Sequence, residues 1–332
     1  MPHRGPGWVK GDLHSHSHHS DARCSVGELA AAARRRGLDF LAVTDHNTVS
    51  HHAHLAAHSG PDLCLIPGQE VTTYYGHANV WGPGRWLDFR CRTTQEIGRV
   101  CAEAHREGRL FSVNHPKPKG PEWKFGLDVP FDCVEVWQGP WPRENDHSLA
   151  FWEHLLRSGR RVVAVGGSDS HPFPLANGRS FDWLGYPTTW VYAQDLTVES
   201  VLAGIRAGHV TISACVSGAQ AVLIARGSGQ VALQGDVVEM DECRVEVRVV
   251  GGEGLWLRLL TRRGEVAREV VPSADWVFQH DLALADHGYV RAEIRVPDTR
   301  HKTPVEGLPM VAMTNPVWHS RFLRGSQKGG SR

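Results

Sequence analysis

The chain has 332 residues, and its 36 lysine and arginine residues balance its 36 aspartate and glutamate residues. A formal net charge of zero excludes a global basic field that would attract nucleic acid or an anionic membrane. The sequence has no apolar run of about 18 residues that would span a bilayer, and residues 1–5 lack the apolar core of a secretory signal. The length favours two domains, or one large barrel with an appended domain.

Cysteine and histidine usage narrows the class of protein further. Seven cysteines are spread along the chain, an odd number, and none forms a Cys-x-x-Cys pair. This distribution indicates reduced, mostly buried thiols in a cytoplasmic protein. Nine of the 21 histidines fall between His14 and His58, a concentration that surface solubility does not explain. The sequence gives no indication of the oligomeric state.

The first 195 residues contain seven short β-type runs, several of them continuously apolar, as strands buried on both faces should be. The runs lie at residues 8–13, 40–44, 63–67, 110–114, 133–137, 162–166 and 188–192. Amphipathic helical patterns alternate with them at residues 25–36, 94–107, 146–157 and 198–207. The first helix begins with Ser25 and Glu28 at capping-box spacing and ends before Gly37. This alternation predicts a parallel β/α architecture, and seven strands favour a closed or slightly distorted barrel over an open sheet.

Beyond about residue 217 the pattern changes to alternating strands without a convincing helix. Val245, Val247 and Val249 alternate with polar residues, and further strands are predicted at 289–296 and 310–313. About one hundred residues with this pattern suit an antiparallel β-sandwich, whose default role is to cap the barrel. The predicted organisation is a barrel over residues 1–215, a β-sandwich over 216–319 and a disordered basic tail over 320–332.

The most informative motif is Gly11-Asp12-Leu13-His14-Ser15-His16, which places two histidines two residues apart at the end of an apolar run. Alternate residues of an extended strand point to the same side, so His14 and His16 can bind one ion together. Further candidate ligands follow, namely Asp21, Asp45-His46, Glu70 with His77, His115, and Asp169 with His171. The loops after the strands of a β/α barrel meet on one face, so these residues predict one polynuclear metal site.

At this point the sequence resembles a known family. The series His-x-His…Asp, Thr-Asp-His, Glu, His and Ser-Asp-x-His is similar to the PHP (polymerase and histidinol phosphatase) superfamily of metallohydrolases. Residues 70–77 (Glu-Val-Thr-Thr-Tyr-Tyr-Gly-His) and Thr314-Asn315-Pro316 look like its CehA/McbA branch. The resemblance covers nearly all of residues 8–318 and is strongest in the metal motifs. One departure is Ala22, where the family usually has glycine after the aspartate.

The resemblance implies a distorted (β/α)7 barrel that holds two or three divalent ions. By that pattern His14, His16, Glu70 and Asp169 would hold the first ion, Glu70 would bridge to a second ion completed by His77 and His115, and Asp21, His46 and His171 would hold a third. Imidazole and carboxylate ligands suit Zn, Mn or Fe alike. Glu70, His171 and Asp45 are candidate catalytic residues, and Asp45 would orient a ligand or accept a proton.

Substrate-binding residues are sought in the loops on the same face. Lys117 follows His115 in a Pro- and Gly-rich loop, and Arg143 and Arg179 follow the fifth and sixth strands, so all three are candidate contacts for an anionic phosphoryl group. Five tryptophans either line an apolar pocket for an aromatic leaving group or pack the barrel rim: Trp81, Trp86, Trp123, Trp141 and Trp183. His51, His54 and His58 share a helical spacing, for which a solvated face is the expectation rather than metal loading.

The predicted function is metal-dependent hydrolysis, in which a metal-bound hydroxide attacks an electrophilic phosphorus or carbonyl carbon. A phosphoesterase acting on a small phosphoester is the first prediction, and a carbamate, ester or amide hydrolase of aryl substrates with the same metal site is the alternative. A non-catalytic PHP scaffold is a third reading, disfavoured because every matched ligand position holds a competent residue. The expected partner is a small-molecule substrate, with no membrane, and with nucleic acid only as a small nucleotide substrate.

Overall fold

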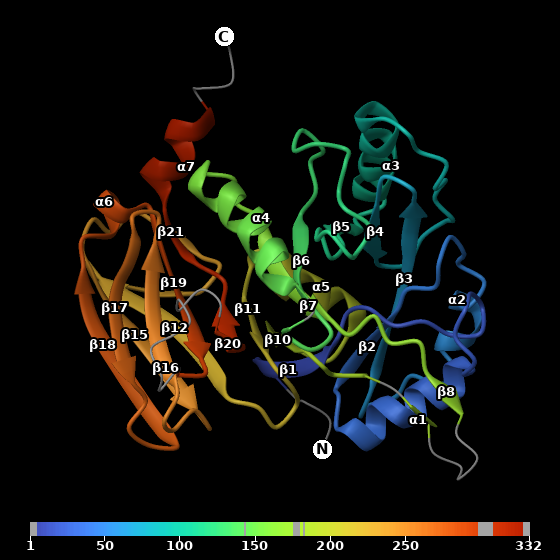
Figure 1. Ribbon diagram of the computed structural model, residues 1–332, viewed down its shortest axis with the longest axis horizontal. Coiled ribbons are helices and arrows are strands. Elements are labelled where there is room, and N and C mark those ends of the chain that lie inside the picture. Colours follow the sequence, from blue (N-terminus) through green and yellow to red (C-terminus); the bar gives the residue numbers. More distant parts are fainter. Residues whose placement is uncertain (1–4, 143, 175–179, 182, 298–307, 328–332) are drawn as a thin grey trace.

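The computed structural model describes residues 5–142, 144–174, 180–181, 183–297 and 308–327. Figure 1 shows a mixed α/β part, which contains the N-terminal two thirds of the chain, beside a C-terminal part made mostly of strands. Within the described residues, no helix is both long enough and apolar enough to cross a membrane.

The mixed part alternates strands and helices, as the sequence predicts. In chain order its elements are β1 (Gly7–Asp12), α1 (Val26–Arg36), β2 (Phe40–Val43), α2 (His52–Leu55), β3 (Cys64–Thr73), β4 (Gly76–Trp81), α3 (Thr94–Arg106), β5 (Leu110–Val113), β6 (Cys133–Gln138), α4 (Asn145–Arg157), β7 (Val163–Gly167), β8 (Phe173–Pro174), β9 (Ser180–Phe181), β10 (Thr188–Ala193), α5 (Val198–Ala207) and β11 (Val210–Ser213). The capping box of α1 is present, since the Ser25 side chain accepts from the Glu28 amide and Glu28 binds back to Ser25.

One large sheet runs through this part in the order β11-β10-β1-β2-β3-β4-β5-β6-β7. Strands β1, β2 and β3 are parallel, as are β5, β6 and β7. The segments that follow β1 and β7 also meet, because the Asp169 amide donates to the His14 carbonyl at 2.9 Å and the His16 amide to the Ser170 carbonyl at 3.0 Å. The carboxyl ends of the first and last parallel strands therefore lie side by side.

The prediction of a uniformly parallel architecture is wrong at two strands. Strand β4, which the sequence prediction missed, follows β3 after the two-residue turn Tyr74–Tyr75 and pairs antiparallel with both β3 and β5. A turn this short permits only an antiparallel pair. Strand β10 pairs antiparallel with β1. A parallel pairing is usually reached through a crossover helix, and the described residues between β7 and β10 contain none.

The C-terminal part consists of two layers whose strands are antiparallel, except that β14 and β21 in the second layer pair in parallel. One is the sheet β13 (Gln230–Leu233), β12 (Gln220–Gly227), β15 (Cys243–Val250) and β18 (Asp275–Leu282). The other contains β14 (Val237–Val238), β16 (Trp256–Thr261), β17 (Gly264–Val270), β19 (Tyr289–Arg295), β20 (Met310–Thr314) and β21 (Val317–His319). Side chains of both layers share one hydrophobic cluster, which includes Val245, Val247 and Ile294. Because β20 pairs with β11, the second layer continues the large sheet, and the predicted boundary at residues 215/216 stays a prediction.

Two short helices depart from the sequence prediction. Helix α6 (Leu284–His287) lies in the region predicted to contain strands alone. Helix α7 (Ser320–Gln327) occupies the start of the tail predicted to be disordered. The ring of Phe322 stacks on Trp318 and lies beside Tyr289, so an apolar contact orders the beginning of this basic segment. Residues 328–332 of the predicted tail lie outside the described residues.

Candidate metal centre

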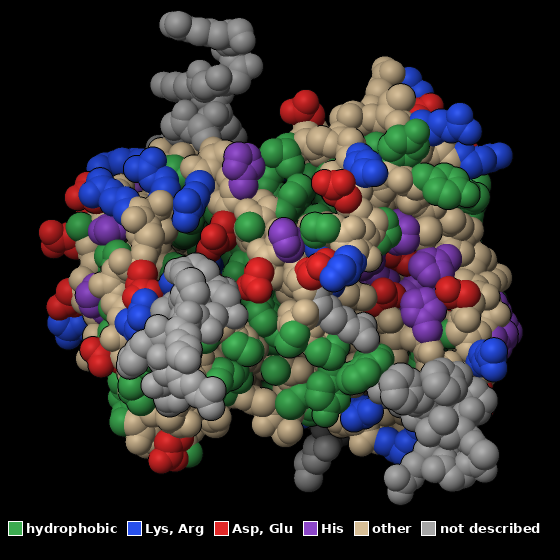
Figure 2. Space-filling model, viewed as in Figure 1, with side chains coloured by type: hydrophobic (Ala, Val, Ile, Leu, Met, Phe, Trp, Pro, Cys, Tyr) green, Lys and Arg blue, Asp and Glu red, His purple; other side chains and the backbone are tan. Residues whose placement is uncertain are grey.

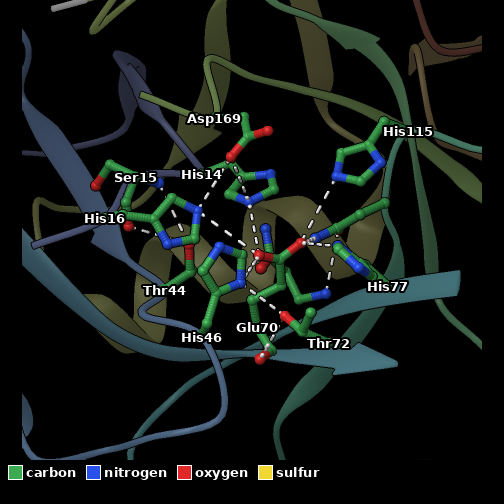
Figure 3. A network of polar contacts seen from close by, with 12 residues as sticks. His14, Ser15, His16, Thr44, His46, Glu70, Thr72, His77, His115 and Asp169 are labelled. Carbon is green, nitrogen blue, oxygen red and sulfur yellow. Dashed lines mark hydrogen bonds and ion pairs between the residues drawn. The ribbon is translucent and has the colours of Figure 1, made fainter. Parts of the chain in front are cut away.

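The nine predicted ligands come together in one cluster. Figure 3 labels His14, His16, His46, Glu70, His77, His115 and Asp169 among them. They form four overlapping groups, and within each group the ligand atoms lie within 4.8 Å of one another. The groups are His14, His16 and Glu70; His14, His115 and Asp169; Glu70, His77 and His115; and His16, Asp21, His46 and His171. Seven of the ligands follow strands, as expected, whereas Glu70 and His77 lie inside β3 and β4. Figure 2 shows histidine side chains gathered among acidic ones on one side of the molecular surface.

Glu70 lies at the centre of the inner groups and is buried. Its Oε2 atom is 3.4 Å from His14 Nε2 and 3.6 Å from His16 Nε2. Its Oε1 atom is 3.1 Å from His77 Nδ1 and 3.6 Å from His115 Nε2. Each carboxylate oxygen thus faces a different pair of these imidazoles, and the ring of His46 makes a third contact with Oε2. This is the arrangement that a carboxylate bridging two cations requires.

The inner residues fit a divalent cation. His14 Nε2 and Glu70 Oε2 are fully buried and have no hydrogen-bond partner, a condition that costs about 1–3 kcal/mol for each group. Two ligand atoms on one tetrahedral zinc ion lie roughly 3.3 Å apart, since each bond is about 2.0–2.2 Å long. The 3.4 Å between these two atoms matches that spacing. A cation between them would satisfy both.

The fourth group is more open to solvent. The side chains of Asp21, His171 and His46 are 57%, 33% and 24% exposed. His171 Nε2 lies 3.1 Å from Asp21 Oδ1 and 3.4 Å from His46 Nε2. His46 also reaches back to the centre, because its Nδ1 atom is 2.7 Å from Glu70 Oε2. A ligand approaching from solvent therefore meets this group first.

Glu135 on β6 holds two of the ligands, although the sequence prediction did not include it. Its Oε1 atom accepts a hydrogen bond from His14 Nδ1 at 2.9 Å, and its Oε2 atom accepts one from the His115 amide at 3.1 Å. The first bond places the His14 proton on Nδ1 and leaves Nε2 to face Glu70. A Cβ atom on Gly167 would lie 2.4 Å from Glu135 Oε1, so glycine is needed there. The available signal was a lone acid within the apolar run Val134-Glu135-Val136.

Further side chains fix the carboxylates and the outer imidazole. Gln138 Nε2 donates to Asp169 Oδ2 at 2.8 Å, and Asn114 Nδ2 donates to Glu70 Oε1 at 3.0 Å. The Thr72 hydroxyl lies 2.6 Å from His46 Nδ1. The backbone is strained at the same place, since the ligands His115 and Asp169 have φ angles of 26° and 52°. Such left-handed backbone in residues other than glycine tends to cluster at functional sites.

Asp45, a predicted catalytic residue, belongs to none of the four ligand groups. Its carboxylate accepts hydrogen bonds from the Ser17 amide at 2.7 Å and the Ser20 hydroxyl at 2.6 Å. It therefore holds the loop between His16 and Asp21, which agrees with the orienting role rather than with proton transfer. His51 lies 3.1 Å from Asp45 and is buried, so the expectation of a solvated face is wrong for this histidine. Burial lowers the pKa of His51 to about 4.

The electrostatics of the centre favour cations. Burial would raise the pKa of Glu70, but the charge of His14 and close contacts with the neighbouring imidazoles hold this pKa well below its usual range. The pKa of Asp169 is likewise lowered, because His14 and His16 outweigh burial. Burial opposes protonation of His14, yet Glu135, Asp169 and Glu70 raise its pKa well above the usual value. A bound cation would take the place of that proton in the field of the three carboxylates.

Known proteins give a partial match to this site. The PHP domain family matches residues 12–99, a segment that contains six of the nine ligands. This segment has the PHP domain pattern. A 41-residue stretch is 46% identical to the DNA polymerase/3'-5' exonuclease PolX of Bacillus subtilis (strain 168), and it covers 12% of this chain and only 7% of that protein.

Two solved structures are similar to this chain at low sequence identity. One is a two-domain protein from Bacteroides vulgatus ATCC 8482 that contains a predicted PHP-like metal-dependent phosphoesterase. It is 16% identical, with a TM-score of 0.50 over 94% of this chain and 96% of that chain. The other is an inferred metal-dependent phosphoesterase from Bifidobacterium adolescentis ATCC 15703. It is 15% identical, with a TM-score of 0.40 over 58% of this chain and 95% of that chain. The first likeness shows that the two-part fold is shared.

Lys117 lies beside two of the predicted ligands, as expected from the sequence. It is 5% exposed, and its Nζ atom donates to Gln138 Oε1 at 2.6 Å and to Asn145 Oδ1 at 3.3 Å. Together with His115 and Asp169 it lines a cavity of about 500 Å³. The cavity therefore joins a cationic side chain to two ligands. Arg143 and Arg179, the other predicted substrate contacts, lie outside the described residues.

Three of the five tryptophans belong to the hydrophobic core rather than to a pocket. Trp123 and Trp141 are part of the largest core cluster, and Trp81 is part of the cluster around β1 and β2. Trp86 is 41% exposed, and its indole N–H donates to the Asn47 carbonyl. Of the two roles predicted for the tryptophans, lining an apolar pocket or packing, the three buried rings therefore have the packing role.

Proposed function

We propose that this chain is a metal-dependent hydrolase of the PHP type, specifically a phosphoesterase that acts on a small phosphoester. The observation that carries the proposal is the convergence of nine imidazole and carboxylate ligands around Glu70, with buried ligand atoms that lack hydrogen bonds. The PHP match over residues 12–99 and the phosphoesterase description of the Bacteroides vulgatus protein support it. The distorted (β/α)7 barrel, the CehA/McbA branch and a cytoplasmic location belong to the same proposal.

The ligand groups suggest which residues would hold the ions. His14, His16, Glu70 and Asp169 would hold one ion, Glu70, His77 and His115 a second, and Asp21, His46 and His171 a third. Two or three divalent ions of Zn, Mn or Fe suit this donor set, which contains no thiolate. When bound, they would supply Lewis-acid polarisation of the scissile group and activation of a water molecule.

The side chains around the ligands would position the ligands and bind the substrate. Glu135 keeps the His14 proton on Nδ1, and Gln138 and Asn114 fix the carboxylates of Asp169 and Glu70. Lys117 presents a charged Nζ atom beside His115, where it would bind an anionic oxygen of the substrate as a point charge. His171, one third exposed, would act as a ligand on the solvent side, since its Nε2 atom lies 3.1 Å from Asp21 Oδ1.

A carbamate, ester or amide hydrolase of aryl substrates is the second candidate, because the same ligands would serve carbonyl chemistry. The observation in its favour is an aromatic-lined cavity of about 410 Å³ beside His77. A non-catalytic scaffold is the weakest reading, since none of the matched ligand positions holds a residue unable to bind metal.

The test is an assay of metal-reconstituted protein on nitrophenyl phosphate monoesters and diesters, an aryl carbamate and an aryl acetate. Glu70→Gln is the control for the metal centre. Phosphate turnover that the variant loses supports the phosphoesterase. Turnover of the carbamate or acetate alone would replace it with the second candidate, and turnover that is equal in both proteins would contradict the assigned centre.

A further inference from the structure

A second cavity is lined by the ligand His77, whereas the Lys117 cavity is lined by the ligand His115. The second cavity has a volume of about 410 Å³ and is lined by Asn47, Thr72, Thr73, Tyr74, Tyr75, His77, Phe89, Arg90, Cys91 and Arg92. His77 belongs to the ligand groups, and the Thr72 hydroxyl contacts the ligand His46. The cavity is therefore continuous with the candidate metal centre rather than a separate surface depression.

The aromatic side chains of this cavity are unusually open to solvent. Tyr74 and Tyr75, at the turn between β3 and β4, are 99% and 38% exposed, and Phe89 is partly buried. Trp86, which is 41% exposed, lies edge-on to Phe89 with ring centroids 6.3 Å apart. Exposed aromatic rings gathered at one place on a soluble protein usually mark a site of contact with a ligand.

Each of the two cavities is lined by one imidazole of the same ligand group. His115 lines the Lys117 cavity and His77 lines the aromatic one, and the two imidazole rings are 5.4 Å apart. Both face Glu70 Oε1. A substrate whose scissile bond lies over this pair would extend one end toward Lys117 and the other toward Phe89 and Tyr75.

We propose that the cavity formed by Tyr75, Phe89 and His77 is the subsite for the leaving group of the substrate, and that this group carries a planar aromatic ring. The proposal rests on the proposed hydrolase function and assigns the anionic end of the substrate to the Lys117 cavity. The ring packs on Phe89 and Tyr75. Arg92, which lines the same cavity, would place a positive charge near the negative charge that an aryl oxide gains as it leaves, whereas Arg90 is paired with Asp88 at 2.8 Å.

The experiment compares two phosphate monoesters, 4-methylumbelliferyl phosphate and ethyl phosphate, on metal-loaded wild type and Phe89→Ala. Each variant is compared with wild type on the same ester, so the intrinsic reactivities of the esters cancel. Phe89→Ala is expected to lower kcat/KM about tenfold for the aryl ester and less than twofold for ethyl phosphate. Tyr75→Ala, at an exposed position, is the second variant, and Phe278→Ala on β18 is the matched control with no expected effect.

Binding of 4-methylumbelliferone, the aryl product, is measured separately by its fluorescence. The expected result is a Kd at least fivefold weaker in Phe89→Ala and Tyr75→Ala than in wild type and Phe278→Ala. If no phosphate ester turns over but this binding pattern is found, the phosphoesterase fails and the subsite stands. Equal losses on both esters, or product binding that neither variant changes, would overturn the subsite while leaving the phosphoesterase intact.

Discussion

Two clusters of buried ionisable side chains differ in how their charges are compensated. At the junction of α4 and the C-terminal strands, Glu293 lies 2.7 Å from Arg291, 2.7 Å from Arg295 and 3.0 Å from Arg258. At the candidate metal centre, every ion pair found for Glu70 and Asp169 among the described residues is with a histidine. The junction neutralises its acid with permanent cations, whereas the centre surrounds its acids with groups that are ordinarily neutral.

The difference separates a structural cluster from a binding cluster. Arginine stays protonated at any ordinary pH, so the charge of Glu293 is balanced without a ligand. The centre contains buried atoms of His14 and Glu70 that lack hydrogen bonds, and its excess of negative charge requires a cation from outside. We therefore expect substitutions at the junction to reduce stability, and substitutions at the centre to reduce metal binding and turnover.

The largest expected effect is that of Glu70→Gln. The amide keeps the size of the side chain but cannot bridge two cations, so turnover should fall roughly 10³-fold, equivalent to about 4 kcal/mol. Bound metal, measured by elemental analysis after dialysis, should fall with it, and circular dichroism should show an unchanged fold. Full metal content in the variant would break the contrast between the two clusters.

Glu293→Gln should act on stability instead. Removing the charge leaves three buried arginines without their shared partner, a loss of about 3–5 kcal/mol for a broken buried pair. The paired arginines outweigh burial and hold the pKa of Glu293 at about 2, below its ordinary value of 4.5. Its stabilisation is therefore complete above pH 4.5 and is lost as the pH falls toward 2. Urea unfolding should show the wild-type advantage shrinking over that range, and an equal advantage at both ends would contradict this role.

Glu135→Gln tests whether a residue behind the ligands tunes the centre. The glutamine amide has one acceptor oxygen where Glu135 uses two, and it lacks the negative charge behind His14, so metal affinity should fall about 10–100-fold. Competition with a chelator measures the affinity. The matched control is Glu199→Gln on the exposed first turn of α5, which should bind metal like wild type. Equal affinities in all three proteins would remove Glu135 from the account.

The smallest effect is expected for Lys117→Met. Loss of one point charge beside His115 should raise KM for a phosphate ester about tenfold and change kcat less, because the charge contacts the substrate in both ground and transition states. Lys10→Met is the control. Lys10 is on β1, its Nζ atom lies over the ring of Trp190 on β10, and it lines neither cavity. A fall in kcat without a change in KM would indicate that Lys117 acts on the ligands through Gln138.

Much of the fold and the ligand set could be predicted because the signals are local. The capping residues of α1 and the bounds of α5 follow from neighbouring residues, and the ligands stand in short motifs at strand ends. The direction of β10 depends on a partner almost 180 residues away along the chain, at β1, and no local pattern encodes it. Strand β4 was missed because a two-residue turn joins it to β3 without a break in β-type residues.

The positioning residues were harder to predict than the ligands. Glu135 and Gln138 belong to no motif, and their roles depend on the distance between β6 and the ends of β1 and β7. The predicted aromatic pocket rested on tryptophans, the largest apolar residues, and large apolar residues are the ones that folding buries most readily. Tyr75 and Phe89, which line the observed cavity, became apparent only from their exposure in the fold.

The most direct test of the central claim is X-ray anomalous scattering from crystals of the protein grown with Mn²⁺ or Zn²⁺, recorded at the absorption edge of the metal. The account predicts a strong peak about 2.0–2.2 Å from both His14 Nε2 and Glu70 Oε2, with a second peak between Glu70 Oε1 and the rings of His77 and His115. A fully loaded crystal with no anomalous peak within bonding distance of Glu70 would contradict it.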